Sequence, residues 1–205
     1  MPQEMRCELI SWSVVEHRCR RVARMIRESG YEPELIIAIG RGGYVPARLL
    51  CDNLHIMALT SIKVEHYLSG ADRQKEAVVR YPLKADIRGL RVLVVDDVND
   101  TGDTLEVAMR HLEAFRPAAI RTAVMHEKTG TSRSADYLAT KIIKWRWLIY
   151  PWAVNEDISG FLQRLAPASL EEAQALLQRH YGINLSLARL EAIYETIGSA
   201  GLPDG

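Results

Sequence analysis

The sequence has few cysteines, no excess of charge of either sign and no long hydrophobic run. Its cysteines, Cys7, Cys19 and Cys51, are odd in number and lack metal-ligand spacing, which indicates reduced thiols in a cytoplasmic protein. The 26 basic and 26 acidic residues balance, so no bulk field attracts nucleic acid or an anionic membrane. Charged residues come too early at the N-terminus for a signal peptide, and no apolar run approaches membrane length. We therefore expect neither secretion nor a membrane span.

What the chain does contain is typical of a globular α/β protein. Its 205 residues suffice for one domain with an extension, and 48% of them are hydrophobic while 25% are charged. Apolar runs at 35–39 and 92–95 predict buried strands, 120–125 predicts a third, and helical patterns at 11–29 and 105–115 alternate with them. We expect an open, mostly parallel sheet flanked by helices, with ligands beyond the carboxyl ends of the strands.

The most informative stretch is 92–104, which reads VLVVDDVNDTGDT. Its apolar start predicts a strand buried on both faces, and Asp96 and Asp97 come where this strand should end. The following loop and helix start supply Asp100, Thr101, Gly102, Asp103 and Thr104. A strand, a glycine turn and a helix N-terminus in this order favour binding of an anion such as phosphate.

The acids of this stretch and its backbone amides need different partners. A carboxylate about 4 Å from a phosphate is repelled by roughly 4 kcal/mol at a surface-like dielectric, whereas a helix terminus returns only about 0.3–1 kcal/mol. We therefore expect the amides and the hydroxyls of Thr101 and Thr104 to hold the phosphate. Asp96 and Asp97 should face sugar hydroxyls or Mg²⁺, a cation that prefers oxygen ligands.

A second glycine-rich loop follows the strand at 35–39. Gly40, Gly42 and Gly43 let the backbone approach a ligand closely, and Arg41 is a planar cation suited to phosphate oxygens. Taken alone, this loop also fits a plain tight turn.

These two loops resemble motifs of one enzyme family. DDVNDTGDT resembles the phosphoribosyl-pyrophosphate (PRPP) motif of the type I phosphoribosyltransferases. AIGRGGYVPARLL resembles the pyrophosphate loop of the 6-oxopurine members of that family, above all the xanthine-guanine and hypoxanthine-guanine enzymes. The resemblance covers about residues 9–157 and implies the type I phosphoribosyltransferase fold with a small hood.

The resemblance implies roles for the residues of both loops. The acidic pair would bind the ribose hydroxyls and Mg²⁺, the only cofactor expected, and the 100–104 turn would wrap the 5-phosphate. Residues 40–43 would hold pyrophosphate, with a cis peptide bond at Arg41–Gly42. Three residues would be catalytic: Asp100, which manages the proton of purine N7, Arg41 and Tyr67.

Further segments match the base-binding parts of the family. Lys128 lies where relatives have a lysine that donates to the purine 6-oxo group. WLIYPW resembles the segment whose tryptophan stacks on the base, so Trp147 would stack and Leu148 would offer backbone groups. The xanthine-guanine enzymes have an aspartate directly after PW. Here Ala153 follows, which leaves the second Mg²⁺ open, with Glu156 or Asp157 as substitutes.

A polar stretch at 68–79 has the composition of a mobile loop and matches the family's catalytic lid. Tyr67 matches the tyrosine of the family's Ser-Tyr pair, whereas His66 replaces its serine. Arg73 and Lys75 could help neutralise the leaving pyrophosphate, although both also fit a solvated loop.

We expect a phosphoribosyltransferase domain at 1–157 and a helical C-terminal extension at 158–205. Ser169 and Glu172 form a capping box that predicts a helix to His180, and 185–197 predicts another. The pair looks like a helix-turn-helix, but its mixed charge argues against nucleic acid as a partner. The extension could also cover the core, form an oligomer interface or bind another protein.

The function implied is purine salvage: transfer of phosphoribosyl from PRPP to N9 of hypoxanthine, guanine or xanthine. A PRPP-binding regulatory protein, or an enzyme for another nucleobase, is the alternative. The sequence does not rank the three bases. It does not give the subunit number either, although relatives are commonly homodimers or homotetramers.

Overall fold

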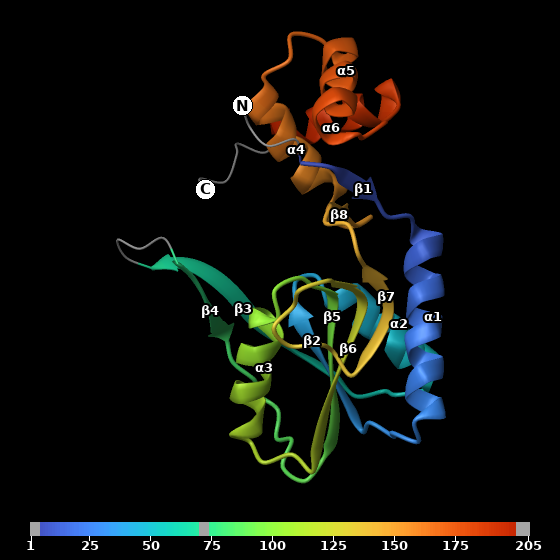
Figure 1. Ribbon diagram of the computed structural model, residues 1–205, viewed down its shortest axis with the longest axis vertical. Coiled ribbons are helices and arrows are strands. Elements are labelled where there is room, and N and C mark those ends of the chain that lie inside the picture. Colours follow the sequence, from blue (N-terminus) through green and yellow to red (C-terminus); the bar gives the residue numbers. More distant parts are fainter. Residues whose placement is uncertain (1–4, 70–73, 200–205) are drawn as a thin grey trace. The chain divides into compact units, whose positions relative to one another are not determined.

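The computed structural model describes residues 5–69 and 74–199, and within these ranges the apolar runs form a six-stranded sheet (Figure 1). The strand order is β4-β3-β2-β5-β6-β7. Its strands are β2 (Leu35–Gly40), β3 (Leu59–Ser69), β4 (Gln74–Tyr81), β5 (Arg91–Asn99), β6 (Ala119–Lys128) and β7 (Tyr137–Ile142). The pairs β2–β3, β2–β5, β5–β6 and β6–β7 are parallel, and β3–β4 is antiparallel. The expected open, mostly parallel α/β sheet is confirmed.

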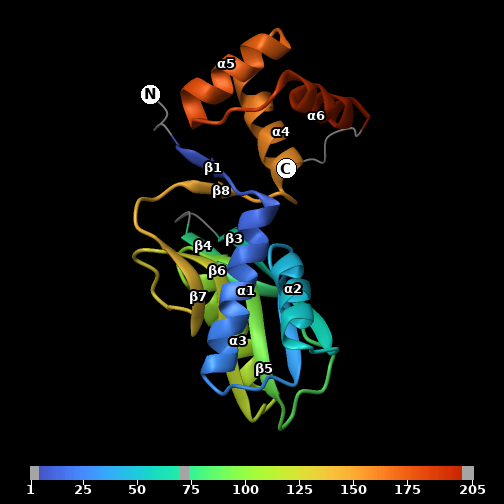
Figure 2. The same ribbon diagram turned by 90° about the vertical axis from the view of Figure 1, so that its right-hand side faces the viewer.

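Helices cover both faces of this sheet. Figure 2 shows α1 (Trp12–Glu28) and α2 (Tyr44–Leu54) in front of it and α3 (Asp103–Glu113) behind. The apolar residues of β2 and β5 alternate between the two faces, since Ile37 and Val94 join the cluster under α3 while Val95 faces α1 and α2. Both strands therefore need a continuous apolar run, because each buries side chains on the two faces of the sheet.

Two compact units make up the chain. One comprises Ser13–Lys144 and contains the six-stranded sheet. The other combines Met1–Trp12 with Trp145–Gly205, and here β1 (Cys7–Leu9) pairs in parallel with β8 (Trp147–Ile149). Its helices are α4 (Val154–Leu165), α5 (Leu170–Tyr181) and α6 (Leu187–Ser199). The boundary expected at 157 remains a prediction from the resemblance, and α4 runs through that position.

The unit with the three C-terminal helices has its own apolar core. Ile158, Phe161, Leu177 and Leu190 are buried there together with Ile149 of β8. As predicted, Ser169 caps α5: its Oγ accepts a hydrogen bond from Glu172 N at 3.2 Å, and Ala168 N donates to Glu172 Oε2 at 2.7 Å.

The expectation of a loop over 68–79 is wrong for much of that stretch. β3 continues to Ser69 and β4 begins at Gln74, so the described part of this stretch forms two antiparallel strands. The consecutive apolar residues Ala77, Val78 and Val79 at the end of the stretch pair with β3 and extend the sheet. Arg73 lies outside the described residues, as do the side chains of Tyr67 and Lys75.

Among residues 5–69 and 74–199, no helix combines the length and the apolar character needed to cross a membrane. All three cysteines of the chain are free thiols, and burial raises the pKa of Cys19 to about 12. This thiol is therefore unreactive at neutral pH.

Candidate active site

The two predicted ligand loops lie at the carboxyl ends of the adjacent strands β2 and β5. Gly42 is packed against the second of the two acids of β5: a Cβ atom on this glycine would lie 2.5 Å from Cγ of Asp97. The structure thus brings the glycine loop and the acidic pair together, as the sequence predicts for parallel strands.

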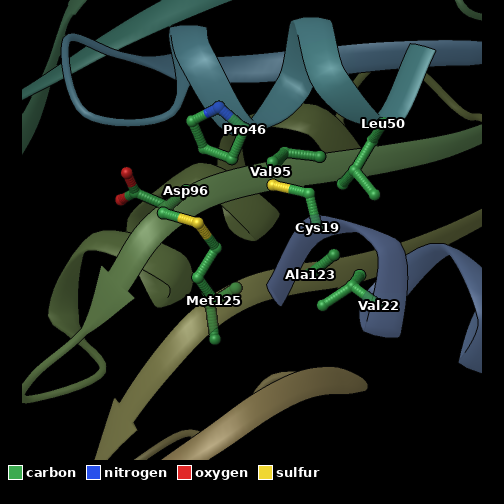
Figure 3. Close-up of a pocket in the computed structure, with 9 residues that line it drawn as sticks. Cys19, Val22, Pro46, Leu50, Val95, Asp96, Ala123 and Met125 are labelled. Atoms are coloured by element: carbon green, nitrogen blue, oxygen red, sulfur yellow. The ribbon is translucent and has the colours of Figure 1, made fainter. Parts of the chain in front are cut away.

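The acidic pair is held by its own backbone. Asp97 N donates to Asp96 Oδ1 at 2.9 Å, and Val98 N donates to Asp97 Oδ1 at 2.7 Å. Figure 3 shows the carboxylate of Asp96 pointing away from the buried apolar side chains around it, such as Val95. Burial raises the pKa of Asp96 well above its usual range, and the charge of Asp97 raises it further. A cation beside the pair would lower the pKa of Asp96 again, because it favours the charged form of a carboxyl group.

These carboxylates fit the ligand chemistry of Mg²⁺, which often takes one or two carboxylates and completes its shell with substrate phosphates and water. In the described part of the chain, no group of three His, Cys, Asp or Glu side chains could hold a metal ion. A metal bound by Asp96 and Asp97 would therefore need further ligands from the substrate.

The glycine loop packs directly on the ends of both strands. A Cβ atom on Gly43 would lie 2.3 Å from Val95 O and 2.7 Å from Ile39 O, which are backbone atoms that cannot move aside. The cis peptide bond lies at Gly40–Arg41, one residue before the bond at which the resemblance placed it. Arg41 lies within this loop and is exposed, as a cation that binds phosphate needs to be.

The turn between β5 and α3 has the expected conformation. Gly102 has a φ of 101°, which favours glycine, and α3 begins at the following Asp103. Thr101 Oγ1 donates to Asp103 Oδ2 at 2.8 Å. The helix N-terminus leaves backbone N–H groups without intrahelical partners at this end, which suits an anion.

Lys128 and Asp100 meet at the end of the sheet. The parallel register of β5 and β6 pairs Asn99 with Glu127, so the next residue on each strand is brought into contact. Lys128 Nζ lies 2.5 Å from Asp100 Oδ2; the lysine side chain is 5% exposed and the aspartate 42% exposed. The buried ammonium group thus has a counter-charge, while one side of the carboxylate remains open to a ligand.

His66 is a residue whose role the sequence did not reveal beyond its departure from the family pattern. Its Nε2 lies 3.0 Å from Thr104 Oγ1, so β3 contacts the predicted phosphate turn. Glu127 and Asn99 are two further residues that the sequence does not single out as functional. Their signal is that each is a polar residue in an otherwise buried strand.

Trp147 and Leu148 belong to the other unit, where both lie on β8. Trp147 is 39% exposed and Leu148 is buried. Asp157 of α4 accepts a hydrogen bond from the Trp147 side chain, and although burial raises the pKa of Asp157, this bond lowers it. This carboxylate therefore helps to orient the indole ring. The stacked pair Tyr150–Trp152, with centroids 4.8 Å apart, lies beside it in sequence.

The model of the phosphoribosyl transferase domain matches residues 8–157. Xanthine-guanine phosphoribosyltransferase of Ruegeria sp. is 32% identical over 153 residues, which cover 70% of this chain and 83% of that protein. A purine phosphoribosyltransferase from Pyrococcus horikoshii has a similar structure, with 32% identity and a TM-score of 0.64 over 72% of this chain and 94% of that one. A hypothetical protein from Neisseria gonorrhoeae with bound ppGpp is 26% identical, with a TM-score of 0.66 over 80% and 99% of the two chains.

The family match spans both ligand loops, the Asp100–Lys128 pair and β8, and it agrees with the observed sheet. The chain therefore belongs to the phosphoribosyl transferase domain family.

Proposed function

We propose that this protein is a purine salvage phosphoribosyltransferase that transfers the 5-phosphoribosyl group from PRPP to N9 of a 6-oxopurine and releases pyrophosphate. The family match and the relatives named as purine or xanthine-guanine phosphoribosyltransferases support this reaction class. The observation that carries the choice of base is the contact between Asp100 and Lys128.

This ion pair presents a donor and an acceptor side by side. In a 6-oxopurine, O6 and N7 are neighbours on one edge of the base. Lys128 would donate to O6, and Asp100 would accept the N7 proton. Adenine has an amino group instead of O6, and it would face an ammonium donor without an acceptor between them. The hydrogen bond that O6 accepts would then be lost, at a cost of about 1–3 kcal/mol, so adenine should bind more weakly than a 6-oxopurine.

The neighbouring loops would bind PRPP. The amides and hydroxyls of the turn 101–104 would hold the 5-phosphate, while Asp96 and Asp97 would bind the ribose hydroxyls and Mg²⁺. Bound Mg²⁺ would neutralise negative charge on the pyrophosphate group. Arg41 and the amides of residues 40–43 would stabilise the same charge as the leaving group departs.

The chemistry would pass through a ribosyl cation of oxocarbenium character. The bond between ribose C1 and pyrophosphate breaks as purine N9 approaches the same carbon. Asp100 would remove the proton at N7, which keeps N9 nucleophilic without a full positive charge on the base. Lys128 would fix the orientation of the base and so reduce the entropic part of the barrier.

Three assignments rest on the sequence resemblance. Trp147 stacking on the base, Leu148 backbone groups at the purine edge, and Tyr67 acting in the lid remain predictions. The hydrogen bond from Trp147 to Asp157 supports the first, because an oriented indole ring is a better stacking surface.

The decisive test is product analysis with PRPP, Mg²⁺ and a panel of bases. We expect the nucleoside monophosphates of hypoxanthine, guanine or xanthine, and little or no product with adenine or uracil. Chelation of Mg²⁺ should abolish product formation. Turnover of adenine or uracil in preference to every 6-oxopurine would contradict the proposal.

A PRPP- or nucleotide-binding regulatory protein is the second candidate. The similar Neisseria gonorrhoeae structure contains ppGpp, and this favours a test of that nucleotide as a competitor of PRPP. Tight PRPP binding with no turnover of any base would establish the regulator instead of the enzyme. We also propose a cytoplasmic homo-oligomer, which fractionation and analytical ultracentrifugation would test.

A further inference from the structure

A buried carboxylate joins the end of β5 to the segment that follows β6. Glu127 is 0% exposed, and its Oε2 accepts hydrogen bonds from Asn99 Nδ2 at 3.0 Å and from Ala135 N at 2.8 Å. Asn99 Nδ2 also donates to Arg133 O at 2.7 Å. Residues 131–135, here called the bracing segment, are thereby tied to the last residue of β5.

The bracing segment in turn packs against the predicted phosphate turn. Both N and Oγ of Ser132 donate to Thr101 O, at 2.7 and 2.9 Å. A Cβ atom on Gly102 would lie 2.5 Å from Ser132 Oγ and 2.6 Å from Arg133 N. The Arg133 guanidinium pairs with Glu106 of α3 at 2.5 Å. The turn is therefore fixed by contacts before, within and after its glycine.

Burying the polar side chain of Glu127 costs free energy, so packing alone does not explain its position. Its Oε1 atom has no hydrogen-bond partner within the ranges that the structure describes, which leaves part of the desolvation cost uncompensated. An apolar residue would avoid this cost but would leave Asn99 Nδ2 and Ala135 N without their shared acceptor. The carboxylate is thus best explained by the geometry that it imposes on its two donors.

We propose that Glu127 is a positioning residue for PRPP binding: through Asn99 and the bracing segment it holds the amides of the turn 100–104 in the conformation that receives the 5-phosphate. This inference rests on the proposed function. It adds a residue and a segment that lie outside the PRPP motif and contact no reacting atom.

The experiment compares Glu127→Leu and Asn99→Ser with the wild type. For both, we expect PRPP–Mg²⁺ to bind about 10-fold more weakly by calorimetry, since the loss of one or two buried hydrogen bonds is of that order. Amide hydrogen exchange of residues 100–104 should accelerate in the unliganded protein. Glu127→Gln keeps an acceptor oxygen for both donors and should stay within about 3-fold of the wild type. If Glu127→Leu does not fold, Asn99→Ser carries the same expectation alone.

Tyr31→Phe is the matched control. Tyr31 Oη donates to Val92 O at 2.7 Å, a buried bond to the opposite end of the same strand. This variant should lower the melting temperature without changing PRPP affinity or exchange at 100–104. Unchanged exchange and affinity in folded Asn99→Ser, or equal effects of Tyr31→Phe, would overturn the inference. A wild-type protein that binds no PRPP would instead overturn the proposed function. The exchange measurement would still decide whether Glu127 holds the turn 100–104 in place.

Discussion

At the scale of single residues, Asp100 is the group whose chemistry is easiest to isolate. We expect Asp100→Asn to lower kcat by about 10²–10⁴-fold, the usual contribution of a general base. PRPP affinity should change by less than about 3-fold, because in the proposed function amides rather than this carboxylate hold the phosphate. Steady-state kinetics and calorimetry would measure the two effects separately.

Asp52→Asn is the matched control for this prediction, since Asp52 is an exposed aspartate of α2. It should leave both kcat and PRPP affinity unchanged. Loss of PRPP affinity in proportion to kcat in Asp100→Asn would show that the carboxylate supports the turn instead of acting on the base.

Gly43 offers a second test at this scale. In Gly43→Ala the added methyl group meets Val95 O at 2.3 Å, so the loop has to move. We expect a loss of about 1–3 kcal/mol in the free energy of unfolding and weaker PRPP binding. Gly160→Ala is the control, because the nearest atom to its Cβ is 3.9 Å away and the residue lies within α4. That change should raise stability by about 0.5–1 kcal/mol; similar losses in both variants would contradict the steric explanation.

The residues of the proposed PRPP motif could be singled out from the sequence because they are consecutive and each residue type has a clear chemical use. Their contacts with distant residues could not. The ion pair of Asp100 with Lys128, and the contact of His66 with Thr104, depend on which strands are neighbours and in what register. An isolated sequence contains no direct signal for register.

At the scale of elements, β6 contains a buried histidine that makes stability depend on pH. Burial lowers the pKa of His126 from 6.5 to about 4, and the charge of Arg18 adds to this effect. Between these values the unfolded chain binds a proton that the folded chain excludes, so stability decreases as the pH falls from 6.5 to 4. The difference corresponds to about 3 kcal/mol of unfolding free energy.

Urea unfolding at a series of pH values would test this, with His126→Gln as the variant. The variant should lose much of the decrease between pH 6.5 and 4, whereas the exposed His17→Gln should retain it. An unchanged pH dependence in His126→Gln would show that other groups control acid stability.

Strands β2 and β5 were predictable because residues buried on both faces form uninterrupted apolar runs, and β6 because most of its first seven residues are apolar. The strand β4 was not, since its first residues, Gln74 to Glu76, are polar and follow a glycine-containing stretch. Its pairing with β3 makes it a strand, and this tertiary effect overrides local composition.

At the scale of the whole molecule, the division into two units depends on a pairing that is remote in sequence. Cys7 of β1 is opposite Trp147 of β8, which places the first residues of the chain with its C-terminal helices. Short strands such as Cys7–Leu9 carry little periodicity, so the pairing had no sequence signal. The boundary expected at 157 rests on the sequence resemblance alone.

Each unit has a separate apolar core, and this predicts separable stability. Leu177 is fully buried among α4, α5 and α6, and Leu112 of α3 is fully buried against the six-stranded sheet. Either leucine replaced by alanine should cost about 2–5 kcal/mol in its own unit. Hydrogen exchange should accelerate in residues 154–199 for Leu177→Ala, and in residues 92–125 for Leu112→Ala.

Measuring PRPP binding of the same two variants tests whether the two units are also separable in function. Because α3 begins at the predicted phosphate turn, Leu112→Ala should weaken PRPP–Mg²⁺ binding, whereas Leu177→Ala should leave it within about 3-fold of the wild type. Accelerated exchange along the whole chain in both variants would show one cooperative structure. In that case the C-terminal helices would contribute to the stability of the proposed PRPP site.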